Sequence, residues 1–180
     1  PEMMSGASEQ DLRDRYLVRG LFRAGEIVLT YSHGERFLIG GAVPAAAPLS
    51  LPRQTEPQSA AGHPLLERRE LGVINIGAGE GTVIVDGETF ELAKYEALYV
   101  PMGSQDVQFA GHGARFYLLS VPAHAALALR KLTLAVTQPI QRGSSERSNE
   151  RTIHQLILPH TCRSASLCVH ARNAASSCQT

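Results

Sequence analysis

The fold class is decided by residues 73–92, which read VINIGAGEGTVIVDGETFEL. This stretch holds three short runs of mainly β-branched, aromatic and other apolar residues, and a turn containing glycine separates each run from the next. Such runs, bounded by glycine and aspartate, are typical of β-strands. The Asp86-Gly87 pair is a strong signal for a two-residue hairpin. The stretch therefore predicts three consecutive strands, of which the last two form a hairpin.

The glycine cluster Gly77-x-Gly79-x-Gly81 allows two interpretations. A glycine-rich loop can hold a phosphate group when a helix follows, because the N–H groups of the first helical turn point at the anion. A strand-like run follows this cluster instead. We therefore expect a tight turn between two strands, and not a phosphate site.

The strand pattern continues on both sides of this stretch, and no helical pattern lies between the strands. A short N-terminal helix is predicted from Asp11 to Leu21, where apolar residues recur at near-helical spacing. Closely spaced strands without intervening helices predict an all-β sandwich or barrel. The further strand candidates are residues 26–31, 37–39, 97–100, 115–119 and 152–158.

A long segment from Pro44 to Pro64 interrupts the strands. It contains five of the ten prolines of the chain and has almost no hydrophobic periodicity. Strand-like sequence resumes at once on its far side, so we expect a surface loop within one domain. Loops of this length are usually either mobile or functional.

Composition narrows the class of protein. Of the 180 residues, 43% are hydrophobic and 19% are charged, which is sufficient for a core and atypical of a disordered chain. The 17 basic and 17 acidic residues balance, so no strongly basic nucleic-acid surface is expected. No apolar run approaches the roughly 18 residues that span a bilayer, and the N-terminus lacks a signal pattern. We therefore expect a cytoplasmic protein without membrane or nucleic-acid partners.

The three cysteines, Cys162, Cys168 and Cys178, all lie in the last 19 residues. Their spacing matches neither a C-x-x-C pair nor a zinc-finger interval. We interpret them as free thiols.

Two short sequence motifs of the cupin barrel are partly matched. The first is His-x-His, four residues, Glu, six residues, Gly, and the second is Pro-x-Gly, two residues, His. Glu70 and Gly77 fit the first motif, which places its two histidine positions on His63 and Leu65. The second motif begins at Pro101 and places its histidine position on Asp106. Leucine cannot bind a metal, so we expect a barrel without its metal, although a site of His63, Glu70 and Asp106 stays open.

A polar turn at His33 is the other candidate site in the first half of the chain. Tyr31-Ser32-His33 and Glu35-Arg36 bring several polar groups together there. We take His33, Arg36 and Glu70 as polar candidates for catalysis. The remaining histidines form no i, i+2 or i, i+4 pair, and each is more simply explained as a surface or hydrogen-bonded residue.

The run LERRELGVINIG at residues 66–77 resembles the 5-keto-4-deoxyuronate isomerase family, the 4-deoxy-L-threo-5-hexosulose-uronate ketol-isomerases. Further similar segments follow in the same order, over roughly residues 12–159. They include Tyr31-Ser32-His33, Gly40-Gly41, residues 82–87, residues 97–100, Phe116-Tyr117, Pro122-Ala123-His124 and residues 148–153.

The resemblance implies a two-cupin subunit in a homohexamer. It implies interconversion of 5-keto-4-deoxyuronate and 3-deoxy-D-glycero-2,5-hexodiulosonate during uronate breakdown. It also places the zinc ligands of the family, three His and one Glu, in the second cupin. Residues 1–159 would then form the first cupin-like double-stranded β-helix, or jelly-roll barrel. Residues 160–180 would be the degraded start of the second barrel, so we expect no zinc in this chain.

Two functions follow from these observations. The first is the ketol-isomerase, an aldose–ketose type of intramolecular oxidoreductase, with this chain inactive alone. Arg68, Arg69 and Arg115, with Arg36, are the candidates for pairing with the uronate carboxylate. The second is a non-catalytic cupin module that binds a sugar acid or supports oligomer assembly.

Overall fold

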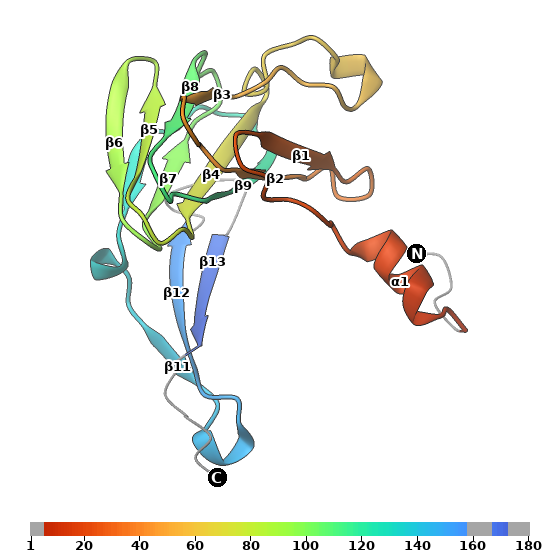
Figure 1. Cartoon of the computed structure of the whole chain (residues 1–180), viewed down its shortest axis with the longest axis vertical. Helices are drawn as coiled ribbons and strands as arrows, with labels where there is room; N and C mark the ends of the chain where they lie inside the picture. Colours follow the sequence, from red (N-terminus) through yellow and green to blue (C-terminus); the bar gives the residue numbers. More distant parts are fainter. Residues whose placement is uncertain (1–5, 158–166, 173–180) are drawn as a thin grey trace.

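The computed structural model describes residues 6–157 and the backbone of residues 167–172. Two antiparallel sheets form a barrel, and a third sheet extends from it (Figure 1). The six-stranded sheet has the order β1-β2-β9-β4-β7-β10, the four-stranded sheet β3-β8-β5-β6, and the three-stranded sheet β11-β12-β13. The all-β class predicted from the sequence is confirmed.

The strands of the six-stranded sheet are β1 (Ile27–Tyr31), β2 (Leu38–Ala42), β9 (Phe116–Pro122), β4 (Arg69–Asn75), β7 (Ala97–Val100) and β10 (Arg130–Leu132). Those of the four-stranded sheet are β3 (Leu49–Ser50), β8 (Val107–Ala110), β5 (Gly81–Val85) and β6 (Glu88–Leu92). The third sheet contains β11 (Ile140–Arg142), β12 (Arg151–Ile157) and β13 (Leu167–Arg172). Short 3-10 helices lie at Gln58–Ala60, Leu134–Val136 and Ser145–Arg147.

The main core lies between the two barrel sheets. Val83 and Phe109 of the smaller sheet meet Leu71, Val73 and other inward residues of the larger sheet there. Strand β4 is buried along all seven residues, because its opposite face is covered as well. On that face, Ile74 packs with Tyr99 of β7 and Leu156 of β12 in a second cluster. The third sheet therefore helps to cover the outer face of the barrel.

The turns agree with the sequence analysis. Asp86 and Gly87 both have positive φ, 50° and 89°, as the tight hairpin between β5 and β6 requires. The glycine cluster connects β4 to β5, and no helix follows it. A Cβ atom at Gly77 would overlap the backbone of Gly113 and Arg115, which explains why glycine stands there.

The structure differs from the sequence-based expectation in the bounds of the N-terminal helix and in one additional strand. The N-terminal helix, α1, spans Glu9–Tyr16 and ends before Leu17, whose backbone is extended. Ser8 and Asp11 form a capping box that starts the helix earlier than its apolar spacing suggests, and none of its residues is buried. Residues 160–180 show no strand pattern, yet β13 lies within them, because the edge of β12 supplies backbone partners.

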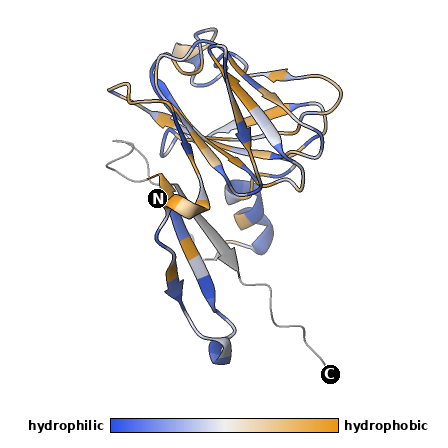
Figure 2. Cartoon of the chain, turned by 90° about the vertical axis from the view of Figure 1, so that its left-hand side faces the viewer, coloured by the Kyte–Doolittle hydropathy of each residue, from blue (hydrophilic) through white to orange (hydrophobic). Residues whose placement is uncertain are grey.

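The hairpin of β11 and β12 extends away from the barrel, and its outer end is hydrophilic (Figure 2). Within residues 6–157 and 167–172, no helix has the length and apolar character needed to cross a membrane.

Candidate functional site

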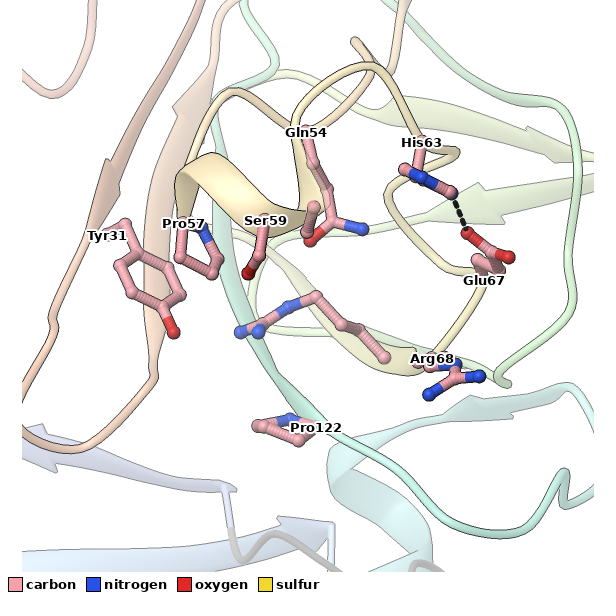
Figure 3. A pocket seen from close by; sticks show the side chains of 10 residues that line it. Tyr31, Gln54, Pro57, Ser59, His63, Glu67, Arg68 and Pro122 are labelled. Atoms are coloured by element: carbon pink, nitrogen blue, oxygen red, sulfur yellow. Dashed lines mark hydrogen bonds and ion pairs between the residues drawn. The ribbon is translucent and has the colours of Figure 1, made fainter.

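A pocket of about 350 Å³ opens where β4 begins, beneath the long proline-rich loop (Figure 3). Strands β1, β4 and β9 each contribute to it, and the loop supplies the opposite wall. Its lining consists of Tyr31, Gln54, Pro57, Ser59, Ala60, His63, Glu67, Arg68, Arg69 and Pro122.

The loop wall is held in place by hydrogen bonds across the loop. The Gln54 N–H donates to the His63 carbonyl at 3.0 Å, and the Gly62 N–H donates to the Gln54 carbonyl at 2.9 Å. The Gln54 side chain, 7% exposed, donates to the Pro64 carbonyl, and Arg53 donates to the Gly62 carbonyl. The loop has almost no hydrophobic periodicity, so these hydrogen bonds, rather than a buried apolar face, fix its conformation. They turn an irregular loop into one wall of the pocket.

Arg69 contributes the most buried charge of the pocket, with 5% of its surface exposed. Its Nε donates to Ser120 Oγ at 3.1 Å, and its Nη2 donates to the main-chain oxygens of Ser120 and Arg36, both at 2.8 Å. The guanidinium also lies 5.7 Å from the centre of the Tyr31 ring. Burial lowers the pKa of Arg69 from its ordinary value, and Tyr31 acts in the opposite direction. An arginine pKa starts so high that the group stays charged at neutral pH.

His63, Glu67 and Arg68 form the rim. His63 Nδ1 and Glu67 Oε2 are 2.7 Å apart, and both side chains are about half exposed. Arg68 is exposed beside them. With His63 neutral, two arginines and one glutamate give the lining a net positive charge. The pocket can therefore receive an anion.

The structure brings Arg68 and Arg69 together in one pocket, and His33 and Arg36 lie next to it. His33 is exposed, 3.6 Å from Glu56 and in edge contact with the Tyr31 ring at 5.0 Å between centroids. Arg36 has a positive φ of 56°, and its main-chain oxygen, not its exposed guanidinium, contacts Arg69. Arg36 thus contributes to the pocket through its backbone, whereas Tyr31 contributes through its side chain.

Glu70 and Arg115 lie elsewhere. Glu70 is 3% exposed on the outer face of β4, where it accepts a 2.9 Å hydrogen bond from Tyr99 Oη. Arg115 lies past the other end of β4, where its main-chain oxygen accepts from the Ile76 N–H and its guanidinium stacks on Phe22. Neither side chain lines the pocket.

The residues at the cupin ligand positions do not converge in a way that fits zinc. His63 pairs with Glu67 at the rim, Glu70 faces away from it, and Asp106 accepts from Gln108 on the smaller sheet. Among the residues that the structure describes, no three His, Cys, Asp or Glu side chains are grouped so that they could hold a metal ion.

Several lining residues were not selected as site candidates from the sequence, among them Gln54, Ser59 and Pro122. Gln54 and Ser59 lie in the irregular loop, and Pro122 ends β9. No spacing rule marks them, because Gln54 and Ser59 reach the pocket only through the packing of the loop, and Pro122 reaches it only through the pairing of β9 with β4. Ser120, which positions Arg69, was not selected either, because it lies just past the strand candidate at residues 115–119.

Three comparisons place the chain among known proteins. The profile described as the KduI/IolB family matches residues 16–174. A Cereibacter sphaeroides protein named 4-deoxy-L-threo-5-hexosulose-uronate ketol-isomerase is 48% identical over 158 residues, which is 88% of this chain and 56% of that protein. A protein of the same name from Agrobacterium fabrum is 41% identical over 167 residues, covering 93% of this chain and 59% of that protein.

The crystal structure of an IolB-like protein from Salmonella typhimurium matches the fold with a TM-score of 0.52 and 15% identity. That match covers 69% of this chain and 45% of the other. The fold is thus the cupin-like barrel expected from the sequence. The chain spans a little over half the length of the curated relatives it matches. The profile match and these identities show that the chain belongs to the KduI/IolB family.

Proposed function

We propose that this chain is part of a 4-deoxy-L-threo-5-hexosulose-uronate ketol-isomerase. The observation that carries the proposal is the 48% identity over 158 residues to a protein of that name. The reaction would interconvert the 5-keto-4-deoxyuronate with 3-deoxy-D-glycero-2,5-hexodiulosonate. The pocket is chemically compatible with such a substrate, because two arginines face a space that can receive a carboxylate.

A ketol-isomerisation moves a proton from one carbon to its neighbour while an enolate oxygen is stabilised. A general base and a group that stabilises the oxyanion are therefore needed. The described residues at the cupin positions do not form a zinc site, and we assign no step of the reaction to them. We propose that zinc and its ligands belong to the remaining part of the enzyme, and that this barrel contributes substrate-facing cations and packing.

On this proposal, the 180-residue chain has no isomerase activity by itself. The purified chain would be assayed with 5-keto-4-deoxyuronate, with added zinc and with a chelator. We expect no turnover under either condition. Zinc-dependent turnover by the chain alone would contradict the proposal that zinc and its ligands belong to the remaining part of the enzyme.

A chimera tests the proposed activity more directly. The 158-residue segment of the Cereibacter sphaeroides protein that matches this chain would be replaced by the corresponding segment of this chain. If the segments are equivalent, the chimera should keep isomerase activity within about tenfold of the parent. A folded chimera of the parental oligomeric state that lacks activity would argue against the proposed function.

The second candidate is a non-catalytic cupin module for sugar-acid binding or oligomer assembly. The positive pocket favours binding, whereas the exposed apolar side chains of Leu12 and Tyr16 in α1, and of Leu17 just after it, favour assembly. An inactive chimera that still binds a uronate would support this alternative. The homohexamer and the cytoplasmic location also remain proposals, which native mass spectrometry and cell fractionation would test.

A further inference from the structure

Arg69 is a buried cation without an acidic partner. The ion pairs formed within the described residues do not include it, and its hydrogen bonds go to one hydroxyl and two main-chain oxygens. Placing a charge in a protein interior is costly, and the usual compensation is a counter-ion. The barrel thus holds the Arg69 guanidinium in position and leaves its positive charge available to a bound anion.

The free part of the guanidinium is identifiable. Nε and Nη2 are occupied by Ser120 and Arg36, whereas Nη1 donates to neither, and the Tyr31 hydroxyl lies close enough to the guanidinium to raise the pKa of Arg69. Arg69 lines the pocket, which makes the pocket the space that its Nη1 donors reach.

The surroundings add donors of the appropriate kind. The Arg68 guanidinium and the hydroxyls of Ser59 and Tyr31 line the same space. The one carboxylate, Glu67, is engaged by His63 at 2.7 Å and leaves the pocket with a net positive charge. Arginine matches the planar geometry of a carboxylate, and charge-assisted hydrogen bonds are about twice as strong as neutral ones.

We propose that this pocket is a binding site for a small sugar acid, with the ligand carboxylate on Arg69 Nη1 and Arg68. The ligand hydroxyls then face the Ser59 and Tyr31 hydroxyls and the Gln54 amide. The volume of about 350 Å³ suits a molecule of this size, because small-ligand cavities begin at roughly 300 Å³. The sugar part of this assignment rests on the proposed function. The carboxylate part rests on the unpaired charge alone.

Calorimetric titration of the chain with D-galacturonate, D-galactose and acetate tests the site. Galacturonate and galactose share a ring and differ at the carboxylate, whereas acetate carries the carboxylate without the sugar. We expect galacturonate to bind, galactose not to bind, and acetate to bind at least about tenfold more weakly than galacturonate. Equal binding of galactose would overturn the carboxylate assignment, and acetate binding as tightly as galacturonate would overturn the sugar assignment.

Variants locate the binding. Arg69→Met and Arg68→Met should each weaken galacturonate binding by about tenfold or more, whereas Arg115→Met, at the other end of β4, should leave it unchanged. Arg69→Met removes contacts that hold the barrel, so Ala60→Phe provides a variant that fills the pocket from the exposed loop instead. Unchanged binding in Arg68→Met and Ala60→Phe would overturn the proposal. The readout is independent of turnover, so an inactive chimera would leave this result intact.

Discussion

Arg69 and Glu70 are neighbours in the sequence, but their side chains lie on opposite faces of β4. Arg69 reaches into the pocket beneath the proline-rich loop, whereas Glu70 lies against Tyr99 on the outer face of the sheet. Successive side chains of a strand alternate between its faces, and β4 is buried on both. One dipeptide therefore supplies a pocket cation and a buried carboxylate that have separate surroundings.

The buried pair on the outer face predicts a stability effect. In Tyr99→Phe, Glu70 loses the 2.9 Å hydrogen bond from the phenol while both residues remain buried. The free energy of unfolding should fall by about 1–3 kcal/mol, measured by urea denaturation. Tyr117→Phe is the control, because the Tyr117 side chain on the same face is only partly buried. Equal losses in the two variants would show that the hydrogen bond is not the cause.

Asn75 is expected to be more sensitive than any surface asparagine. Its amide is fully buried, donates to the carbonyls of Gly79 and Leu92, and accepts from the N–H groups of Gly77 and Arg115. Asn75→Ala would leave these four backbone groups without that partner and should lower the free energy of unfolding by about 3 kcal/mol.

Asn149→Ala is the matched control, because Asn149 is exposed and its amide oxygen accepts from Ser144. It should cost less than about 1 kcal/mol. Similar denaturation midpoints for Asn75→Ala and the unmodified chain would contradict the role of Asn75 as the residue that ties β4 to the glycine loop.

The glycine loop predicts a contrast between two substitutions of the same kind. In Gly77→Ala, the added Cβ would overlap the backbone of Gly113 and Arg115, and backbone cannot move aside as a flexible side chain can. We expect a loss of about 2 kcal/mol or more, seen as a lower melting temperature. Gly34→Ala adds the same methyl group in open space and should change stability by no more than about 0.5 kcal/mol. A larger loss of stability in Gly34→Ala than in Gly77→Ala would refute the packing argument.

The Glu96–Lys131 pair predicts a dependence of stability on pH. Partial burial alone would raise the pKa of Glu96, but the Lys131 ammonium at 2.7 Å and the Ala93 N–H at 2.9 Å outweigh it and hold the pKa below its ordinary value. A lowered pKa in the folded state means that the unfolded chain binds the proton more readily. The stabilisation is therefore present above the ordinary value of 4.5 and is lost as the pH falls below it.

Glu96→Gln tests this dependence. At pH 7 the variant should be less stable by about 1 kcal/mol, and the difference should shrink as the pH falls from 5 toward 3. Glu88→Gln, an exposed glutamate on β6, is the control and should show no such trend. A constant difference between Glu96→Gln and the unmodified chain across this range would rule out the ion pair as its source.

Local chemistry explains which parts of the fold were predictable. The Asp86-Gly87 turn and the strands around it depend on neighbouring residues, and the structure has them where the sequence places them. The predicted end of α1 was wrong by several residues. The apolar spacing continues to Leu21, but the helix ends at Tyr16 and has no buried face. Strand β13 was not expected, because its pairing depends on the distant edge of β12.

The site was predictable only as a set of candidates. The sequence marks Arg68, Arg69 and Arg115 as equivalent cations, and it marks Glu70 and His63 as parts of one cupin pattern. The pleat of β4 separates Glu70 from the pocket, and the length of β4 separates Arg115 from it. No spacing rule contains this information, because the partners of Arg69 come from residues 36 and 120.

By itself, the sequence determined the all-β class, the tight turns and the resemblance to a uronate isomerase, since these depend on short contiguous patterns. Tertiary structure decided which charges share a pocket. Arg69 became a buried cation without an acidic partner among the described residues because β1, β4, β9 and the loop at residues 54–63 meet around it. Burial and neighbouring charge are properties of packed elements, and they give otherwise similar arginines different roles.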